Sequence, residues 1–92
     1  NGTGKGLSVQ PLTPQTARSL GVEATEGLVV TNVAPSGPAA DAGFRRGDVI
    51  QQVDGKKVAD AASLRRELAR AGDRPALVLV QRGEASLFLT LG

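Results

Sequence analysis

The alternation of apolar and polar residues along the chain predicts several short strands. Residues 7–10 alternate between the two types, and residues 28–33 form a β-branched run bounded by Gly27 and Pro35. Both patterns are typical of strands. The same reasoning predicts further strands at 49–53, 57–58, 76–80 and 87–91. The run at 76–80 is continuously apolar, which predicts a strand that is buried on both faces.

Three other segments carry the signals of helices. Between residues 61 and 71 the apolar residues recur at helical spacing, Asp60 can cap the first turn, and Gly72 ends the segment. Shorter helices are expected at 13–21 and within 36–43, each with a proline near its start and a glycine at its end. About six strands, two short helices and one longer helix predict an α+β domain with a small closed or strongly curved sheet.

The size of the chain allows one small domain with one core. It has 92 residues, of which 40% are hydrophobic. We therefore expect a single domain over residues 1–92, with a flexible start at residues 1–3. Phe44 and Phe88 are the only aromatic residues, so Leu, Val, Ile and Ala must supply most of the core.

The lack of cysteine and histidine removes most catalytic and metal chemistry from this chain. Disulfides, the Ser-His-Asp and Cys-His triads and the commonest zinc ligand are all missing. A Ser-Lys dyad is the nucleophile arrangement that remains, and the spacing of the serines and lysines does not support one. We expect no enzymatic activity in this chain, no cofactor and no metal site. Arg46-Gly47-Asp48 is interpreted as a turn before a strand rather than as an adhesion motif.

The charge pattern argues against binding to nucleic acids or insertion into membranes. The formal net charge is +2, and the basic residues occur as separated pairs without stacking aromatic neighbours. No apolar run approaches the roughly 18 residues that a membrane span needs. We therefore expect no nucleic-acid partner and no membrane insertion. The chain begins without a signal peptide, and we interpret it as a fragment of a longer protein.

A glycine-rich loop, a strand and a helix together predict a peptide-binding groove. Gly4-Lys5-Gly6 leads directly into the strand at 7–10, and the amphipathic helix at 61–71 is expected to lie beside that strand. The edge of a strand offers N–H and C=O groups to which an extended peptide can add as a further strand. Successive N–H groups of a glycine loop can form a nest for an anion, such as the terminal carboxylate of a peptide.

The order of these motifs resembles that of PDZ domains, and more narrowly that of the PDZ domains of bacterial HtrA (Do-like, DegP-like) serine proteases. The resemblance is densest over residues 27–33 and 36–50, where Gly-Leu-Val-Val precedes Ser-Gly-Pro-Ala-Ala, Ala-Gly-Phe and Gly-Asp-Val-Ile. It continues through the turn at 53–58 and the helix at 63–68. In total it covers about residues 4–91.

The resemblance implies a fold and a position in a parent protein. The glycine loop near the N-terminus and the last strand at 87–91 resemble the circularly permuted bacterial arrangement. The implied fold is a PDZ-like, small curved β-sandwich or barrel of about six strands. The turn at 81–84 resembles the second, C-terminal PDZ domain of such proteases.

The resemblance also assigns the peptide-binding residues. Backbone N–H groups of Lys5, Gly6 and Leu7 would hold the terminal oxygens of the ligand. Leu7 and Val9 would line the strand side, and the helix would supply the other wall. The full set is Gly4, Lys5, Gly6, Leu7, Val9, Ala61, Leu64, Arg65 and Leu68.

Two of these positions depart from common family patterns. Lys5 stands where the family usually has an apolar residue, which puts strong binding of a C-terminus in question. Ala61 stands where many animal-type domains have a histidine that selects Ser or Thr in the ligand. That selectivity is therefore not expected here, and apolar ligand residues are favoured.

The implied function is the binding of C-terminal peptides or unfolded, extended protein segments by strand addition. The domain would serve substrate recognition and regulation of a periplasmic HtrA-type serine endoprotease in protein quality control and the stress response, with the catalytic triad outside this chain. Other domains or subunits of that protease are further expected partners. Two alternatives stay open: an oligomer-assembly PDZ domain with a weak or closed groove, and a PDZ domain of another protease or of a secretion protein.

Overall fold

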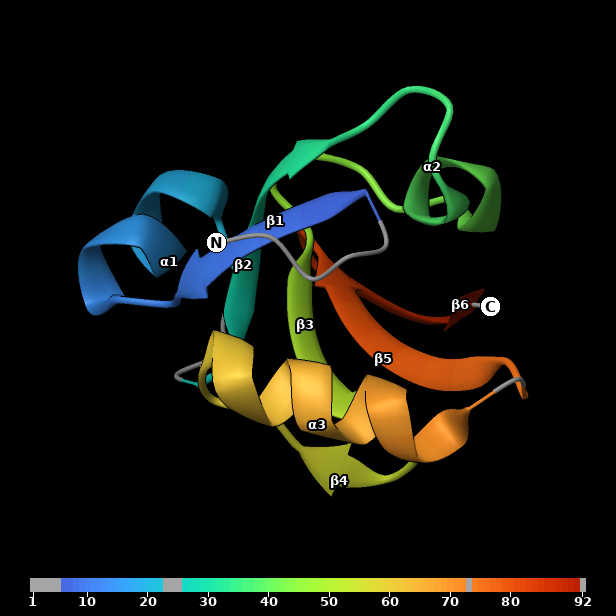
Figure 1. Cartoon of the computed structure of the whole chain (residues 1–92). Helices are drawn as coiled ribbons and strands as arrows, with labels where there is room; N and C mark the ends of the chain where they lie inside the picture. The colour runs from blue at the N-terminus through green and yellow to red at the C-terminus, as the bar shows by residue number, and fades with distance from the viewer. Residues whose placement is uncertain (1–5, 23–25, 73, 92) are drawn as a thin grey trace.

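The structure, a computed structural model, describes residues 6–22, 26–72 and 74–91. Within these residues the chain forms one six-stranded sheet and three helices (Figure 1). The strands are β1 (Leu7–Pro11), β2 (Leu28–Val33), β3 (Val49–Val53), β4 (Lys56–Lys57), β5 (Ala76–Arg82) and β6 (Ala85–Leu91). The helices are α1 (Pro14–Leu20), α2 (Pro38–Ala42) and α3 (Ala61–Ala71). The expected α+β class, with one longer and two short helices, is confirmed.

All strand pairs of the sheet are antiparallel, and its main path runs β1-β2-β3-β5-β6. The short strand β4 pairs with β3 off this path. In the sheet that the described residues form, β1 and β6 are therefore the two end strands.

The register between β1 and β2 contains one irregularity. Ser8 lies opposite Asn32, whereas Val9 lies opposite Val30. The extra residue, Thr31, therefore belongs to β2, and β1 keeps a regular alternation. This regularity decides which backbone groups of β1 point away from the sheet.

The main core is aliphatic and lies between the sheet and α3. Leu28, Ile50 and Leu64 are the largest of its wholly buried side chains. Each such side chain contributes about 1.5–3 kcal/mol relative to an exposed position. A smaller apolar cluster lies against α1 and is formed by Ala17, Val22, Val29 and Val49.

Helices α1 and α3 begin at the capping residues that the sequence predicts. Thr13 Oγ1 accepts a hydrogen bond from the Thr16 N–H at 3.1 Å, and Asp60 Oδ1 accepts one from the Ser63 N–H at 2.7 Å. The bond from the Ser63 backbone lowers the pKa of Asp60. The first turn of α3 is thus held by an ionised carboxylate at neutral pH.

Two details of the strands differ from the expectation. Leu77 is 44% exposed and Leu79 is partly exposed, while alternate residues of β5 are buried. The prediction that this strand is buried on both faces was wrong, because only one face of β5 packs on the core. The short strand expected at 57–58 lies one residue earlier, at Lys56–Lys57.

Candidate functional site

The outer edge of β1 is the first component of the candidate site. The Gly6 C=O accepts a hydrogen bond from the Ala34 N–H on the β2 side. The Leu12 N–H donates one to the Gly27 C=O on the same side. Because backbone groups alternate along a regular antiparallel strand, the odd-numbered positions from 7 to 11 direct theirs away from β2. Pro11 occupies one of these positions, as expected of proline in an edge strand.

The second component is α3, which packs directly beside β1. On one side of its buried face, Glu67 and Arg70 share a polar depression with Asp54 and Lys56, so this flank faces β4 (Figure 1). Successive helical residues are rotated by about 100°. Positions 62, 65 and 69 therefore lie on the opposite flank of α3, which faces β1.

Two residues of this β1-facing flank were not predicted from the sequence. Ala62 and Ala69 are exposed, and each presents only a methyl group toward the side of β1. Arg65 is exposed on the same flank. Ala62 lies three residues before Arg65 and Ala69 lies four residues after it, which places all three on one side of the helix. This spacing identifies the two alanines once the strand that faces the helix is known.

The described members of the predicted peptide-binding set come together where β1 meets α3, a region called here the β1–α3 junction. Five of them belong to one buried cluster and are at most 7% exposed: Leu7, Val9, Ala61, Leu64 and Leu68. They form an apolar floor under the junction. Leu64 is wholly buried and supports this floor from below. Gly4 and Lys5 lie outside the described residues.

Gly6 shapes the chain where it enters β1. Its φ of +73° lies in the left-handed region. A Cβ at this position would lie 3.2 Å from both Ala34 Cβ and Gly37 Cα. Any other residue would be strained and crowded here. A glycine is therefore needed at the point where the sequence predicts the end of the carboxylate-binding loop.

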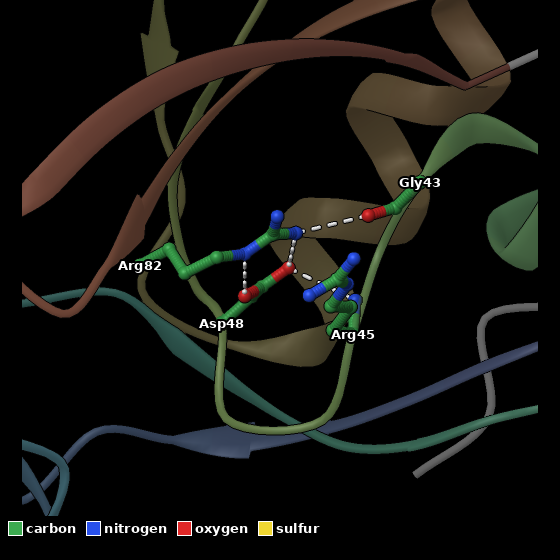
Figure 2. A network of polar contacts seen from close by, with 4 residues as sticks. All are labelled: Gly43, Arg45, Asp48 and Arg82. Carbon is green, nitrogen blue, oxygen red and sulfur yellow. Dashed lines mark hydrogen bonds and ion pairs between the residues drawn. The ribbon is translucent and has the colours of Figure 1, made fainter.

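A buried ion pair that sequence reasoning missed joins β5 to the turn before β3 and to the end of α2 (Figure 2). Asp48 is 1% exposed, and Arg82 donates one hydrogen bond of 2.8 Å to each of its carboxylate oxygens. Arg82 also donates to the Gly43 C=O at 2.9 Å, and the Arg45 N–H donates to Asp48 at 2.9 Å. The bond to Asp48 raises the pKa of Arg82. No short motif signals this pair, because its partners are 34 residues apart.

Among the described residues, no group of three or more His, Cys, Asp or Glu side chains is placed to hold a metal ion. The β1–α3 junction combines a strand edge, an apolar floor and a helix wall that carries Ala62, Arg65 and Ala69. This combination suits an extended chain, which takes its hydrogen bonds from the strand edge and its selectivity from the floor.

Comparison with known families decides the classification. The family model of the PDZ domain matches residues 6–91. The chain belongs to the PDZ domain family. This PDZ domain is similar to parts of curated proteins named as probable periplasmic serine endoproteases of the DegP-like type. The relative from Brucella suis is 38% identical over 82 residues, which make up 87% of this chain and 16% of the relative.

A second relative, from Chlamydia pneumoniae, is 34% identical over 87 residues, or 94% of this chain and 18% of the relative. The PDZ domain thus spans about one sixth of the length of these curated relatives. In the part of the chain that the structure describes, no helix is both long enough and apolar enough to span a membrane.

Solved structures confirm the resemblance to HtrA-type domains. The PDZ domain of HtrA3 bound to a phage-derived ligand, FGRWV, has a TM-score of 0.76 and is 29% identical, covering 95% of this chain and 80% of that one. The HtrA-type protease AlgW with a decapeptide has a TM-score of 0.73 and is 34% identical, covering 95% of this chain and 27% of that one. The assignment to a second PDZ domain stays a prediction.

Proposed function

We propose that this PDZ domain binds C-terminal or unfolded, extended segments of other polypeptides by adding them as a strand along β1. The observation that carries this proposal is that β1 is an end strand whose neighbour is the flank of α3 that carries Ala62, Arg65 and Ala69. An added peptide pairs with the outer edge of β1 beginning at Leu7, and every second side chain points to the floor formed by Leu7, Val9 and Leu68. An apolar ligand residue suits that floor.

The ligands of the solved neighbours support this mode of binding. HtrA3 is bound to FGRWV and AlgW to a decapeptide, and both structures match 95% of this chain. The HtrA3 ligand ends in valine, an apolar residue of the kind that the floor of the β1–α3 junction accommodates. For a single small domain we expect a dissociation constant on the order of micromolar, or about −8 kcal/mol.

The parent protein that we propose is a periplasmic HtrA-type serine endoprotease of protein quality control. The names of the curated relatives and the small share of their length that this chain spans support this assignment. The PDZ domain then recognises substrates and regulates a protease domain whose catalytic triad lies elsewhere in that protein. Ligand binding that orders the domain can bias the protease between inactive and active states.

The test of this function places the same bulky side chain on two sides of α3. Ala69→Trp fills the flank that faces β1, whereas Arg66→Trp changes an exposed position that points away from the core. With the peptide FGRWV as the probe, isothermal titration calorimetry should show at least tenfold weaker binding for the first variant. The second variant should stay within about twofold of the unaltered domain. Equal losses in both variants would place the peptide outside the β1–α3 junction.

A further inference from the structure

The last strand of the sheet is an unprotected edge. β6 lies at the end of the strand order, and in the described part of the chain no strand pairs with its outer edge. Its sequence, Ala-Ser-Leu-Phe-Leu-Thr-Leu, contains no charge, no proline and no glycine. Proteins usually protect such edges with charged residues, proline or bulges, and β1 does so with Pro11. An edge strand of this composition pairs readily with another strand.

The outer face beside this edge is apolar. Phe88 is 62% exposed and Leu77 is 44% exposed, and they are the exposed large hydrophobic residues among those described. Leu79 is partly exposed and lies directly opposite Phe88 in the β5–β6 ladder, while Thr90 lies opposite Leu77. The two exposed residues therefore belong to one patch on the outer face of β5 and β6 rather than to scattered positions.

The cover that α2 provides lies on the other face of β6. α2 packs against this strand, and its end approaches Leu89, since a Cβ on Gly43 would lie 3.6 Å from Leu89 Cδ2. Leu89 pairs with the wholly buried Val78 and so points to the core side, whereas Phe88 points to the outer face. The contact with α2 thus leaves the Phe88 patch exposed.

We propose that the outer edge of β6 pairs antiparallel with the β6 of a second copy of this chain, about a two-fold axis at Phe88. Phe88 is the central residue of the strand, so this register places Phe88 opposite its copy and Leu87 opposite Leu89. It also places Ser86 opposite Thr90, a hydroxyl pair, with all partners on matching faces. On the outer face, Leu79 and Phe88 of the two copies then form one continuous apolar row across four strands.

Charge and size define the kind of dimer that this surface supports. β6 carries no charge, so the two copies meet without like-charge repulsion along the strand. Seven residues span about 24 Å, and a strip of that length buries on the order of 500 Å² in both copies together. Stable dimers bury more than about 1,200 Å². The β6 pair is therefore weaker than a stable dimer and should form only at high protein concentration.

The dimer is independent of the proposed peptide site. Three strands separate β6 from β1 in the sheet order, so both β1 edges remain available in the pair. Two peptide sites on one particle would raise the apparent affinity for a chain that carries two suitable segments.

The test compares self-association of the 92-residue chain and its variants over protein concentrations from about 10 µM to 1 mM. Sedimentation velocity should show a monomer–dimer equilibrium, and amide shifts in NMR spectra should change with concentration at β6. Phe88→Lys and Phe88→Glu should each weaken self-association at least tenfold. An equimolar mixture of the two should restore it to within about threefold, because the opposite charges meet at the two-fold axis. Asn32→Lys, which adds a charge at an exposed position of β2, is the matched control and should have no effect.

Three results would overturn the proposal. The first is a monomer at 1 mM with no concentration-dependent shifts in β6. The second is self-association that persists in both single variants, and the third is a mixture that fails to restore it. If the chain alone is monomeric and a longer form of the protein buries Phe88 against another domain, that domain, and not a second copy, occupies the patch.

Discussion

Replacement of Arg82 by Met should destabilise the domain far more than a typical surface substitution. It removes two hydrogen bonds to Asp48 and one to the Gly43 C=O, and leaves a carboxylate that is 1% exposed with the Arg45 N–H as a remaining donor. Removal of one partner from a buried pair costs about 3–5 kcal/mol. The Arg82 side chain is 34% exposed, so water can reach the carboxylate in the variant. We therefore expect a loss of about 2–3 kcal/mol in the free energy of unfolding.

The assay is urea denaturation followed by far-ultraviolet circular dichroism, because the chain has no Trp or Tyr to report by fluorescence. For a domain of this size, the expected loss lowers Tm by about 10–20 °C. Arg74→Met is the matched control. Arg74 forms an ion pair with Asp54 at 3.6 Å, and the Arg74 and Asp54 side chains are 63% and 25% exposed. Loss of this exposed pair should lower the free energy of unfolding by at most about 0.5 kcal/mol. If Arg82→Met and Arg74→Met unfold at the same urea concentration, the buried pair of Asp48 and Arg82 stabilises the domain no more than the exposed pair does.

Two further substitutions test the backbone and the helix cap. Gly27→Ala should lower the free energy of unfolding by more than about 2 kcal/mol, because the added Cβ would lie 2.6 Å from the Ile50 C=O oxygen. Gly83→Ala should lower it by only about 1 kcal/mol, since the φ of +60° causes backbone strain but nothing lies within 4 Å of the added Cβ. Thermal unfolding measures both losses. Equal losses would contradict the steric argument. The pKa of Asp60 lies below the usual value of an aspartate because the carboxylate accepts the Ser63 bond. Its stabilising contribution is therefore complete above that usual value and is lost as the pH falls through the lowered pKa. Asp60→Asn should remove this part of the loss of stability in acid, measured as the urea midpoint of unfolding at each pH. If the variant shows the same pH dependence as the unaltered domain, protonation of Asp60 is not coupled to unfolding.

Local signals in the sequence were sufficient to predict the elements of the fold. Asp60 and Thr13 mark helix starts because short polar side chains bond to the free N–H groups of the first turn. Period-two and period-3.6 patterns then separate strands from helices. A continuous apolar run does not show how many layers cover a strand, so the exposure of Leu77 became visible only once the sheet and its neighbours were placed.

The candidate site was predictable in outline, and its missing parts depend on tertiary geometry. The buried members Leu7, Val9 and Leu68 follow from periodicity, and the structure brings them together under the β1–α3 junction. Ala69 could not be identified in the same way, because the flank of α3 that faces β1 is set by packing. The pairing of Asp48 with Arg82 is likewise a long-range contact without a local pattern.

The measurement that tests the central claim most directly is an NMR titration of the labelled domain with short peptides that end in Val, Leu or Phe. Each peptide is used with a free terminal carboxylate and in an amidated form. We expect amide shifts concentrated at residues 6–10 and 61–69, which weaken when the peptide is amidated. An absence of shifts at millimolar peptide, or shifts of equal size centred away from β1 and α3, would contradict peptide binding by strand addition at this site.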